Sequence, residues 1–328
     1  MAGAEMSSNP TDPARNWAEL PRDVLSLILR KIGAIEILMG AGLVCRAWLQ
    51  LAKEPQLWRC VDMTHHADLF NTVDMEAMAR TAVDRSGGIM EAFWAEYFGS
   101  DELLQYIADR TNVLKSLRLI SCYHISDEGL AEAAKRFPQL EELEIKFGSF
   151  SEEVCETVGQ VCPQLKRFKL NTQWCYLSPL SDSDEEMEEN EEAIGIANNM
   201  HELRHLQLFG NRLTNDGLMA ILDNCPHLES LDIRQCFNVT MDATLRKKCA
   251  RIRNLRLPHD STDDYEFCAD IGGLESFDND FLSVSSDSDA VYYNEYDYCE
   301  LIDDAVYYNE FDYSELIDDD DMDLFFPF

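Results

Sequence analysis

Apolar residues between positions 88 and 258 recur in a fixed pattern, L-x-x-L-x-L, in which alternate positions of a short segment are apolar. Alternation of this kind predicts a short strand that buries one face. Six copies are clear: Leu114, Leu117 and Leu119; Leu140, Leu143 and Ile145; Leu165, Phe168 and Leu170; Leu203, Leu206 and Leu208; Leu228, Leu231 and Ile233; Ile252, Leu255 and Leu257. A weaker copy begins at Met90 with Phe93 and Ala95.

The copies follow one another at a nearly constant interval. Their first positions are separated by 26, 25, 38, 25 and 24 residues, and the long interval holds an acidic insertion at residues 178–192. A period near 25 residues is typical of a leucine-rich-repeat solenoid, in which each strand is followed by a helix on the outer face. Residues 125–134 predict such a helix, with Ser126 and Asp127 suited to cap it. We therefore expect an α/β fold of short parallel strands with outer helices.

A small polar side chain follows the strand in several copies, at Cys122, Asn211 and Cys236. Such side chains are expected to meet buried backbone groups at the turn. Together with I-S-D-x-G-L at residues 125–130 and the Cys-Pro pairs at 162–163 and 225–226, they resemble the cysteine-containing subtype of leucine-rich repeat. The resemblance implies structural cysteines, and a thiol nucleophile stays a minor alternative.

Three short amphipathic helices are predicted ahead of the repeats. The first begins at Pro21, which suits the first turn of a helix, and ends at Gly33 in a left-handed cap. The apolar positions of the three helices are Val24, Leu25, Ile28, Leu29 and Ile32; Ile35, Ile37 and Leu38; and Val44, Ala47, Trp48 and Leu51. So small a unit buries too little surface to fold alone. The helices therefore either cap the repeats or pack against another protein.

These helical residues resemble the F-box, whose pattern is LP, a spaced apolar helix, VC-x-x-W and a late LW, the last here being Leu57-Trp58. The sequence departs from the pattern at Glu36-Ile37, where an Asp-Leu pair is common, and at Gly40 and Gly42, which weaken the second helix. The resemblance implies that the core and the surface for a Skp-family adaptor are formed by Leu20, Pro21, Leu25, Ile28, Leu29, Val44, Cys45 and Trp48.

An F-box followed by these repeats is similar to plant F-box/LRR-repeat proteins. The similarity implies a non-catalytic substrate-recognition subunit of a Skp-cullin-F-box (SCF) ubiquitin ligase, which binds a Skp-family adaptor, through it a cullin, and an unknown protein substrate. It implies no cofactor. A repeat scaffold that binds protein without recruiting a ligase stays the alternative. The expected divisions are a disordered N-terminus (1–15), the F-box (16–63), a connector (64–87), the repeats (88–258) and an acidic tail (259–328).

The strand positions between the buried leucines are expected to point to the concave side of the solenoid. A curved surface of mixed charge with a few aromatic side chains suits a protein or peptide ligand, although plain solvation of a polar face is the alternative. The candidate substrate-binding residues are Trp94, Arg118, Glu144, Lys169, Gln207, Asp232 and Arg256, with Lys146, Arg167, His205, Phe209 and Arg234 beside them.

The net charge of −35 is concentrated in two stretches. Residues 182–192 carry eight acids and residues 260–328 carry 23 with no Lys or Arg, which leaves about −4 for the rest. The tail also contains a 15-residue tandem duplication, 290–304 and 305–319. Dense like charge favours disorder and disfavours nucleic-acid binding. The favoured interpretation is a solvated tail without a function of its own. A sharper hypothesis is that the tail folds back over Arg118, Lys169, Arg234 and Arg256 until a substrate displaces it.

One motif points to catalysis. His201-Glu202-Leu203-Arg204-His205 matches H-E-x-x-H, which binds zinc when both histidines lie on one helical face. The leucines of this segment are in phase with the repeats, so a strand is predicted and zinc hydrolysis is disfavoured. Scattered cysteines without C-x-x-C indicate reduced thiols in the cytosol or nucleus. No apolar run is long enough for a membrane span.

Overall fold

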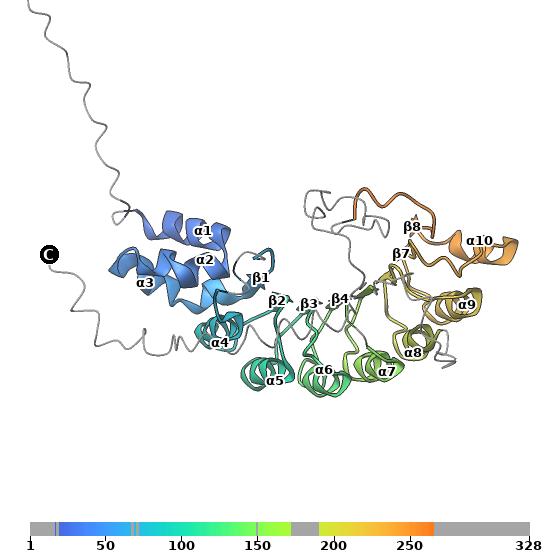
Figure 1. Ribbon diagram of the computed structural model, residues 1–328, viewed down its shortest axis with the longest axis horizontal. Helices are drawn as coiled ribbons and strands as arrows, with labels where there is room; N and C mark the ends of the chain where they lie inside the picture. Colours follow the sequence, from blue (N-terminus) through green and yellow to red (C-terminus); the bar gives the residue numbers. More distant parts are fainter. Residues whose placement is uncertain are drawn as a thin grey trace, which may run out of the picture.

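The computed structural model describes residues 17, 20–66, 69, 72–148, 150–171 and 190–265. Within these ranges the elements run from α1 to β8, with three helices first and strand–helix units after them (Figure 1). Residues 1–15, most of the acidic insertion and residues 266–328 lie outside the described residues, so the expectations for the N-terminus and tail duplication stay predictions.

The N-terminal helices are α1 (Arg22–Ile32), α2 (Ala34–Met39) and α3 (Arg46–Ala52), with short 3-10 helices η2 (Ala41–Leu43) and η3 (Pro55–Trp58) between and after them. Gly33 separates α1 from α2 with φ +90°, a conformation that favours glycine. The helices pack through a small core of Leu25, Leu29, Ile37, Trp48 and Leu51, all buried. The sequence therefore places these three helices correctly.

Eight strands of the described residues form one parallel sheet in sequence order, β1 to β8. The strands are β1 (Cys60–Met63), β2 (Ala92–Glu96), β3 (Ser116–Ile120), β4 (Glu142–Lys146), β5 (Arg167–Asn171), β6 (His205–Gln207), β7 (Ser230–Asp232) and β8 (Asn254–Arg256). Leu117 of β3 lies opposite Leu143 of β4, which lies opposite Phe168 of β5. All three are buried. The repeat pattern is confirmed, and the insertion at residues 178–192 lies between β5 and β6 without shifting their register.

Outer helices follow the strands and lie along the convex side of the curved sheet (Figure 1). They are α4 (Met75–Arg85), α5 (Asp101–Arg110), α6 (Asp127–Ala134), α7 (Glu152–Val161), α8 (Glu191–Asn199), α9 (Asn215–Asn224) and α10 (Ala243–Cys249). Each buries one apolar face against the sheet, as Leu103, Leu104 and Ile107 of α5 show. The helices cover the outer face, so the concave face is left to the strand side chains.

The solenoid begins earlier than the repeat pattern indicates. β1 pairs in register with β2, and α4 forms within the segment that the sequence treats as a connector, residues 64–87. Val61 and Met63 of β1 are fully buried, as the repeat leucines are. One strand–helix unit therefore joins the N-terminal helices to the repeats, and its short strand carries too few apolar positions to show the pattern.

Side chains at the helix N-termini link each repeat to the next. Ser126 caps α6 by accepting a hydrogen bond from the Gly129 N–H at 3.0 Å, as predicted. Its own N–H and hydroxyl donate to the carboxylate of Asp101 in α5, at 2.8 and 2.6 Å. Asp127 accepts from the Ser151 N–H in the next repeat at 3.0 Å. The I-S-D-x-G-L motif thus connects neighbouring outer helices.

The turn cysteines are structural. The Cys122 thiol donates to the Phe98 carbonyl at 2.9 Å and the Cys236 thiol to the Leu208 carbonyl at 2.7 Å. Burial raises the pKa of each thiol to about 12, so both stay protonated near neutral pH. A buried, protonated thiol is a poor nucleophile. The prediction that these cysteines satisfy buried backbone groups is confirmed.

Candidate functional site: an apolar helical face and the concave side of the sheet

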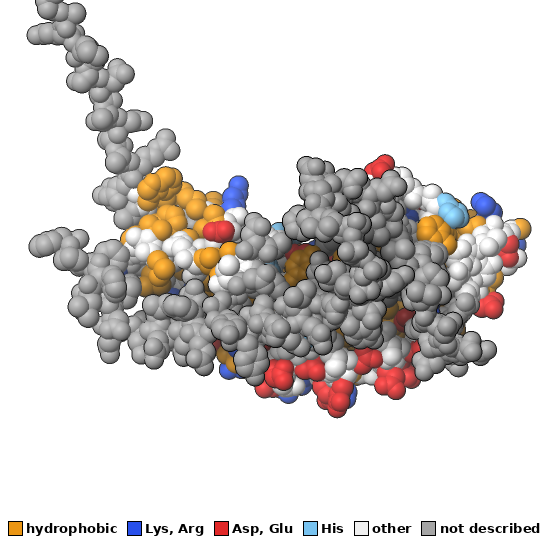
Figure 2. All heavy atoms as spheres, viewed as in Figure 1, with side chains coloured by type: hydrophobic (Ala, Val, Ile, Leu, Met, Phe, Trp, Pro, Cys, Tyr) orange, Lys and Arg blue, Asp and Glu red, His pale blue; other side chains and the backbone are white. Residues whose placement is uncertain are grey.

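An apolar surface covers the end of the molecule formed by α1–α3. Leu27 of α1 is 60% exposed, Leu43 of η2 is 64% exposed and Val44 is 51% exposed. Val24 of α1 and Met39 of α2 are also exposed. Figure 2 shows apolar side chains gathered over this end. We call Val24, Leu27, Met39, Leu43 and Val44 the apolar face. Exposed apolar groups in such number are typical of a protein interaction site.

The residues proposed for adaptor binding divide between the core and the surface. Leu25, Leu29 and Trp48 are buried, and the Trp48 indole N–H donates to the Trp17 carbonyl at 3.1 Å. The others are exposed or half-buried: Pro21 and Val44 are exposed, whereas Leu20, Ile28 and Cys45 are half-buried. Leu25, Leu29 and Trp48 therefore stabilise the helices that carry the apolar face. Only the other five residues have exposed area that a partner can contact.

The F-box pattern did not single out Val24, Leu27, Met39 and Leu43 as candidate site residues. The available signal was that α1 is apolar on more than one side, since Val24 and Leu27 lie away from the stripe of Leu25 and Leu29. A helix with a second apolar side is covered by something besides its own core. The F-box pattern alone does not separate these two sides.

The seven central concave positions lie side by side across the sheet. In the strand register Trp94 of β2 lies opposite Arg118 of β3, and Arg118 lies opposite Glu144 of β4. The same register continues through the next four strands with Lys169, Gln207, Asp232 and Arg256. The row is therefore continuous across seven strands. Its role in substrate binding stays a prediction.

Glu144 is the centre of a buried charge cluster in this row. Its carboxylate pairs with Lys169 at 2.8 Å, Lys146 at 2.7 Å and Arg118 at 3.3 Å. Burial alone would raise the pKa of Glu144, but the ammonium groups of Lys169 and Lys146 outweigh burial and hold the pKa below its ordinary value. Glu144 is thus ionised and paired with neighbouring cations. Its carboxylate stabilises the concave face and is not free to bind a ligand.

Trp94 and Arg118 form an open platform toward the N-terminal side of the row. The Arg118 guanidinium lies 4.2 Å from the centre of the Trp94 ring, and the Trp94 indole donates to the Ser116 hydroxyl at 3.1 Å. Both side chains are half-buried. A flat cation and a flat ring held together suit contact with a peptide.

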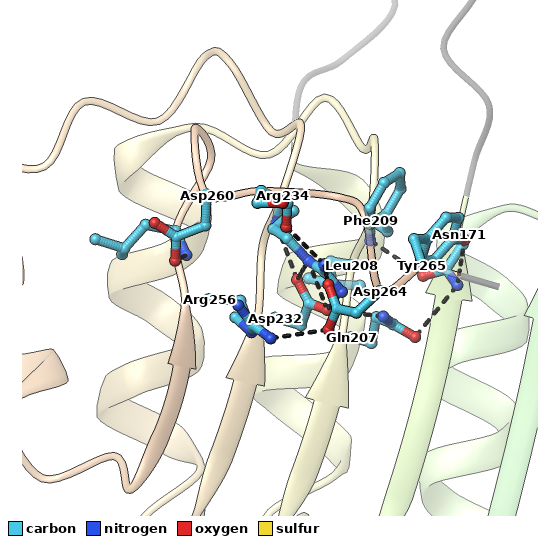
Figure 3. A network of polar contacts seen from close by, with 12 residues as sticks. Asn171, Gln207, Leu208, Phe209, Asp232, Arg234, Arg256, Asp260, Asp264 and Tyr265 are labelled. Atoms are coloured by element: carbon cyan, nitrogen blue, oxygen red, sulfur yellow. Dashed lines mark hydrogen bonds and ion pairs between the residues drawn. The ribbon is translucent and has the colours of Figure 1, made fainter. Parts of the chain in front are cut away.

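The C-terminal side of the row is contacted by the chain itself. Residues 258–265, which we call the return segment, follow β8 and lie across the ends of β7, β6 and β5 (Figure 3). The Asp264 carboxylate accepts hydrogen bonds from Arg234 at 2.6 Å and Arg256 at 2.8 Å. In the part of the tail that the structure describes, two of the four expected contacts are therefore present, those with Arg234 and Arg256. The other two expected residues, Arg118 and Lys169, pair with Glu144.

The H-E-x-x-H segment does not lie on a helix. His201 stands in the turn after α8, where its ring bonds the Asn224 carbonyl at 3.0 Å, and His205 is the first residue of β6. Among the described residues no group of three His, Cys, Asp or Glu is arranged to hold a metal ion.

None of the described helices has the length and apolarity that a membrane crossing requires.

Three short helices with an exposed apolar face, joined to a solenoid of parallel strands and outer helices, define an F-box type of protein with leucine-rich repeats. The F-box-like family model matches residues 17–64, and a leucine-rich-repeat model matches residues 199–222. F-box protein SKIP19 of Arabidopsis thaliana is 43% identical over 87% of this chain and 93% of its own length. The chain therefore belongs to the F-box/LRR-repeat family.

Another Arabidopsis thaliana relative, F-box/LRR-repeat protein 23, is 47% identical over 81% of this chain. The chain spans only 59% of that relative's length. Among solved structures, the yeast Rad7 and Elc1 complex is 16% identical with a TM-score of 0.41, over 72% of this chain and 70% of that chain. The identification depends on the sequence relatives and the family models.

Proposed function

We propose that this chain is the substrate-recognition subunit of an SCF-type ubiquitin ligase. In this proposal α1–α3 bind a Skp-family adaptor and through it a cullin, while the concave side of the repeats binds a protein substrate. The chain supplies no catalytic group, because a receptor of this kind acts by raising the effective concentration of a substrate lysine near the charged enzyme.

The apolar face is the observation that carries the proposal. Fully burying one Leu side chain stabilises an association by about 1.5–3 kcal/mol. Leu27 and Leu43 are each more than half exposed, so their burial under a partner contributes a large part of a stable interface. The helices meet the solenoid through α2, which contacts β1 and α4, and through α1, which contacts η3. The repeats therefore leave the apolar face open to an adaptor.

Co-expression with a Skp-type adaptor tests the proposal. The wild-type chain is expected to co-purify with the adaptor. Leu27→Glu and Leu43→Glu each place a charge in the interface and are expected to weaken adaptor binding at least about 30-fold, which corresponds to about 2 kcal/mol. Both residues are exposed, so the fold is retained and circular dichroism is expected to be unchanged.

Tyr123→Glu is the matched control, because Tyr123 is 57% exposed and lies among the repeats. It is expected to leave adaptor binding unchanged. Replacing Leu20 and Pro21 with Ala tests the adaptor-binding residues that the F-box pattern indicates. If the wild-type chain does not co-purify with any Skp-type adaptor, the ligase proposal fails and a plain repeat scaffold becomes the better account.

A further inference from the structure

The return segment contacts the concave face through two adjacent side chains. After β8 the Gln235 N–H donates to the Pro258 carbonyl at 2.9 Å, which directs the chain back over the sheet. The segment ends with Tyr265, whose hydroxyl accepts from Asn171, a residue 94 positions earlier in β5, at 3.2 Å. Figure 3 shows Tyr265 beside Phe209 and Asn171, and Asp264 beside the two arginines.

The tyrosine rests in a position made by the repeats. Its ring stacks on Phe209 with centroids 3.8 Å apart and the planes 4° from parallel. Asn171 is almost fully buried, and its side-chain oxygen accepts from the Phe209 N–H at 3.1 Å. This bond orients the amide so that its NH₂ group faces the tyrosine hydroxyl. Aromatic stacking and a hydrogen bond from a fixed donor together select a tyrosine.

The aspartate rests between two guanidinium groups. Arg234 is 4% exposed, and its Nη1 donates to Asp264 at 2.6 Å and to the Ser261 carbonyl at 2.9 Å. The other guanidinium nitrogens of Arg234 bond Asp232, at 3.0 Å from Nε and 2.8 Å from Nη2. Arg256 donates to the second Asp264 oxygen at 2.8 Å. Charge-assisted bonds of this kind are among the strongest in proteins.

The repeats hold most of this site by themselves. Asn171 is oriented by the Phe209 backbone and Arg234 by Asp232, so neither depends on the return segment. Asp264 itself is exposed, which leaves the bound pair open to exchange. The same Asp–Tyr pair occurs twice more in the sequence of the tail, at residues 297–298 and 312–313. Because the site is pre-formed and Asp264 is exposed, another Asp–Tyr pair can compete with Asp264–Tyr265 for it.

We propose that Asn171, Phe209, Arg234 and Arg256 form a recognition site for an acidic residue followed by an unphosphorylated tyrosine, which Asp264–Tyr265 fills within the chain and a substrate protein fills in its place. That the competing ligand is a substrate rests on the proposed function, whereas the site itself does not. Burial, with Glu144 and Asp232 adding to it, raises the pKa of Tyr265 far above its ordinary range. A phosphate on the tyrosine would bring a strongly hydrated charge into the place where the hydroxyl contacts the Asn171 amide, and burying that charge is costly.

Binding of a labelled peptide to the full-length chain tests this site. The ligand is a fluorescein-labelled hexapeptide, Thr-Asp-Asp-Tyr-Glu-Phe, which has the sequence of residues 262–267. Binding is measured by fluorescence polarisation to the wild type and to a variant in which all three Asp–Tyr pairs are changed to Ala-Ala. Because an intramolecular ligand competes at about millimolar effective concentration, the variant is expected to bind the peptide at least about tenfold more tightly than the wild type.

Further changes in that variant establish where the peptide binds. Arg256 is exposed, so Arg256→Glu is expected to weaken peptide binding at least about tenfold without unfolding the chain. Arg253→Glu, which reverses an exposed charge just before β8 and outside the site, is the control and is expected to have no effect. A peptide with phosphotyrosine, or with Ala in place of the tyrosine, is expected to bind at least about tenfold more weakly.

The proposal is overturned if the variant binds the peptide no better than the wild type does, or if Arg256→Glu leaves peptide binding unchanged. Adaptor co-purification is measured on the same variants. If the variant without Asp–Tyr pairs fails to bind the peptide but still co-purifies with the adaptor, only the proposed site is contradicted. If the wild-type chain does not bind an adaptor, the proposed function is contradicted, and the conclusion from peptide binding is unaffected.

Discussion

Gly129 illustrates how one residue sets the spacing of two repeats. It is the third residue of α6, and a Cβ at this position would overlap the Asp101 carboxylate of the preceding helix. That carboxylate is held by two hydrogen bonds from Ser126 and has little freedom to move. Gly217 has the same relation to the side chain of Asn190. The glycine of the repeat motif is therefore required by contact between helices.

Gly129→Ala is expected to lower the free energy of unfolding by about 1–2 kcal/mol, because the loss of the Asp101 hydrogen bonds outweighs the helix preference of Ala. Urea denaturation measures the change. In an Asp101→Ala background the overlap is gone, so the same substitution is expected to be neutral or stabilising by up to about 1 kcal/mol. An equal loss in both backgrounds would contradict the steric explanation.

At the scale of elements, β3, β4 and β5 are joined by the charges around Glu144 as well as by their backbone bonds. The Glu144 carboxyl has its pKa lowered by Lys169 and Lys146 against the opposing effect of burial. A group whose pKa is lowered on folding adds stability above its unfolded pKa and loses it as the pH falls through the folded value. Stability from this cluster is therefore present at neutral pH and declines in acid.

Glu144→Gln is expected to destabilise the chain by about 3 kcal/mol at pH 7, because buried cations lose their partner. The difference from wild type is expected to shrink as the pH falls below the ordinary Glu pKa of 4.5. Urea denaturation between pH 3 and pH 7 measures it. Glu132→Gln, at an exposed ion pair with Lys135, is the control and is expected to change stability by less than about 1 kcal/mol. A pH-independent difference for Glu144→Gln would contradict the charge account.

The sequence predicts most elements because leucines at alternate positions and helices with one apolar face carry strong signals. β1 was not predicted, since Val61 and Met63 alone are too few to show an alternation of apolar and polar positions. The buried residues of α4 do have helical spacing, with Met75, Met78 and Ala79 on one face, so this helix was predictable.

The candidate sites were less predictable than the repeats. The F-box pattern combines core residues such as Leu25 with surface residues such as Val44, and only the structure separates them. The return segment depends on contact between residues 94 positions apart, Asn171 and Tyr265, and no local pattern encodes that contact. The tail hypothesis anticipated two arginine contacts from charge alone and missed the stacked tyrosine.

At the scale of the whole molecule, the two proposed binding surfaces belong to different parts of the chain. The apolar face lies on the helices at the N-terminal end, and the Asp–Tyr site lies toward β8 at the far end of the sheet (Figure 1). The shared parallel sheet joins them. In the proposed function the adaptor and the substrate therefore bind separate surfaces, and binding of one leaves the other accessible.

Hydrogen–deuterium exchange of the full-length chain, alone and saturated with a Skp-type adaptor, tests the central claim most directly. The account predicts slower exchange in residues 22–44 on adaptor binding, because α1, α2 and η2 carry the apolar face. Exchange in β3 to β7 is predicted to stay unchanged. Absence of complex formation, or protection confined to the repeats, would contradict the account.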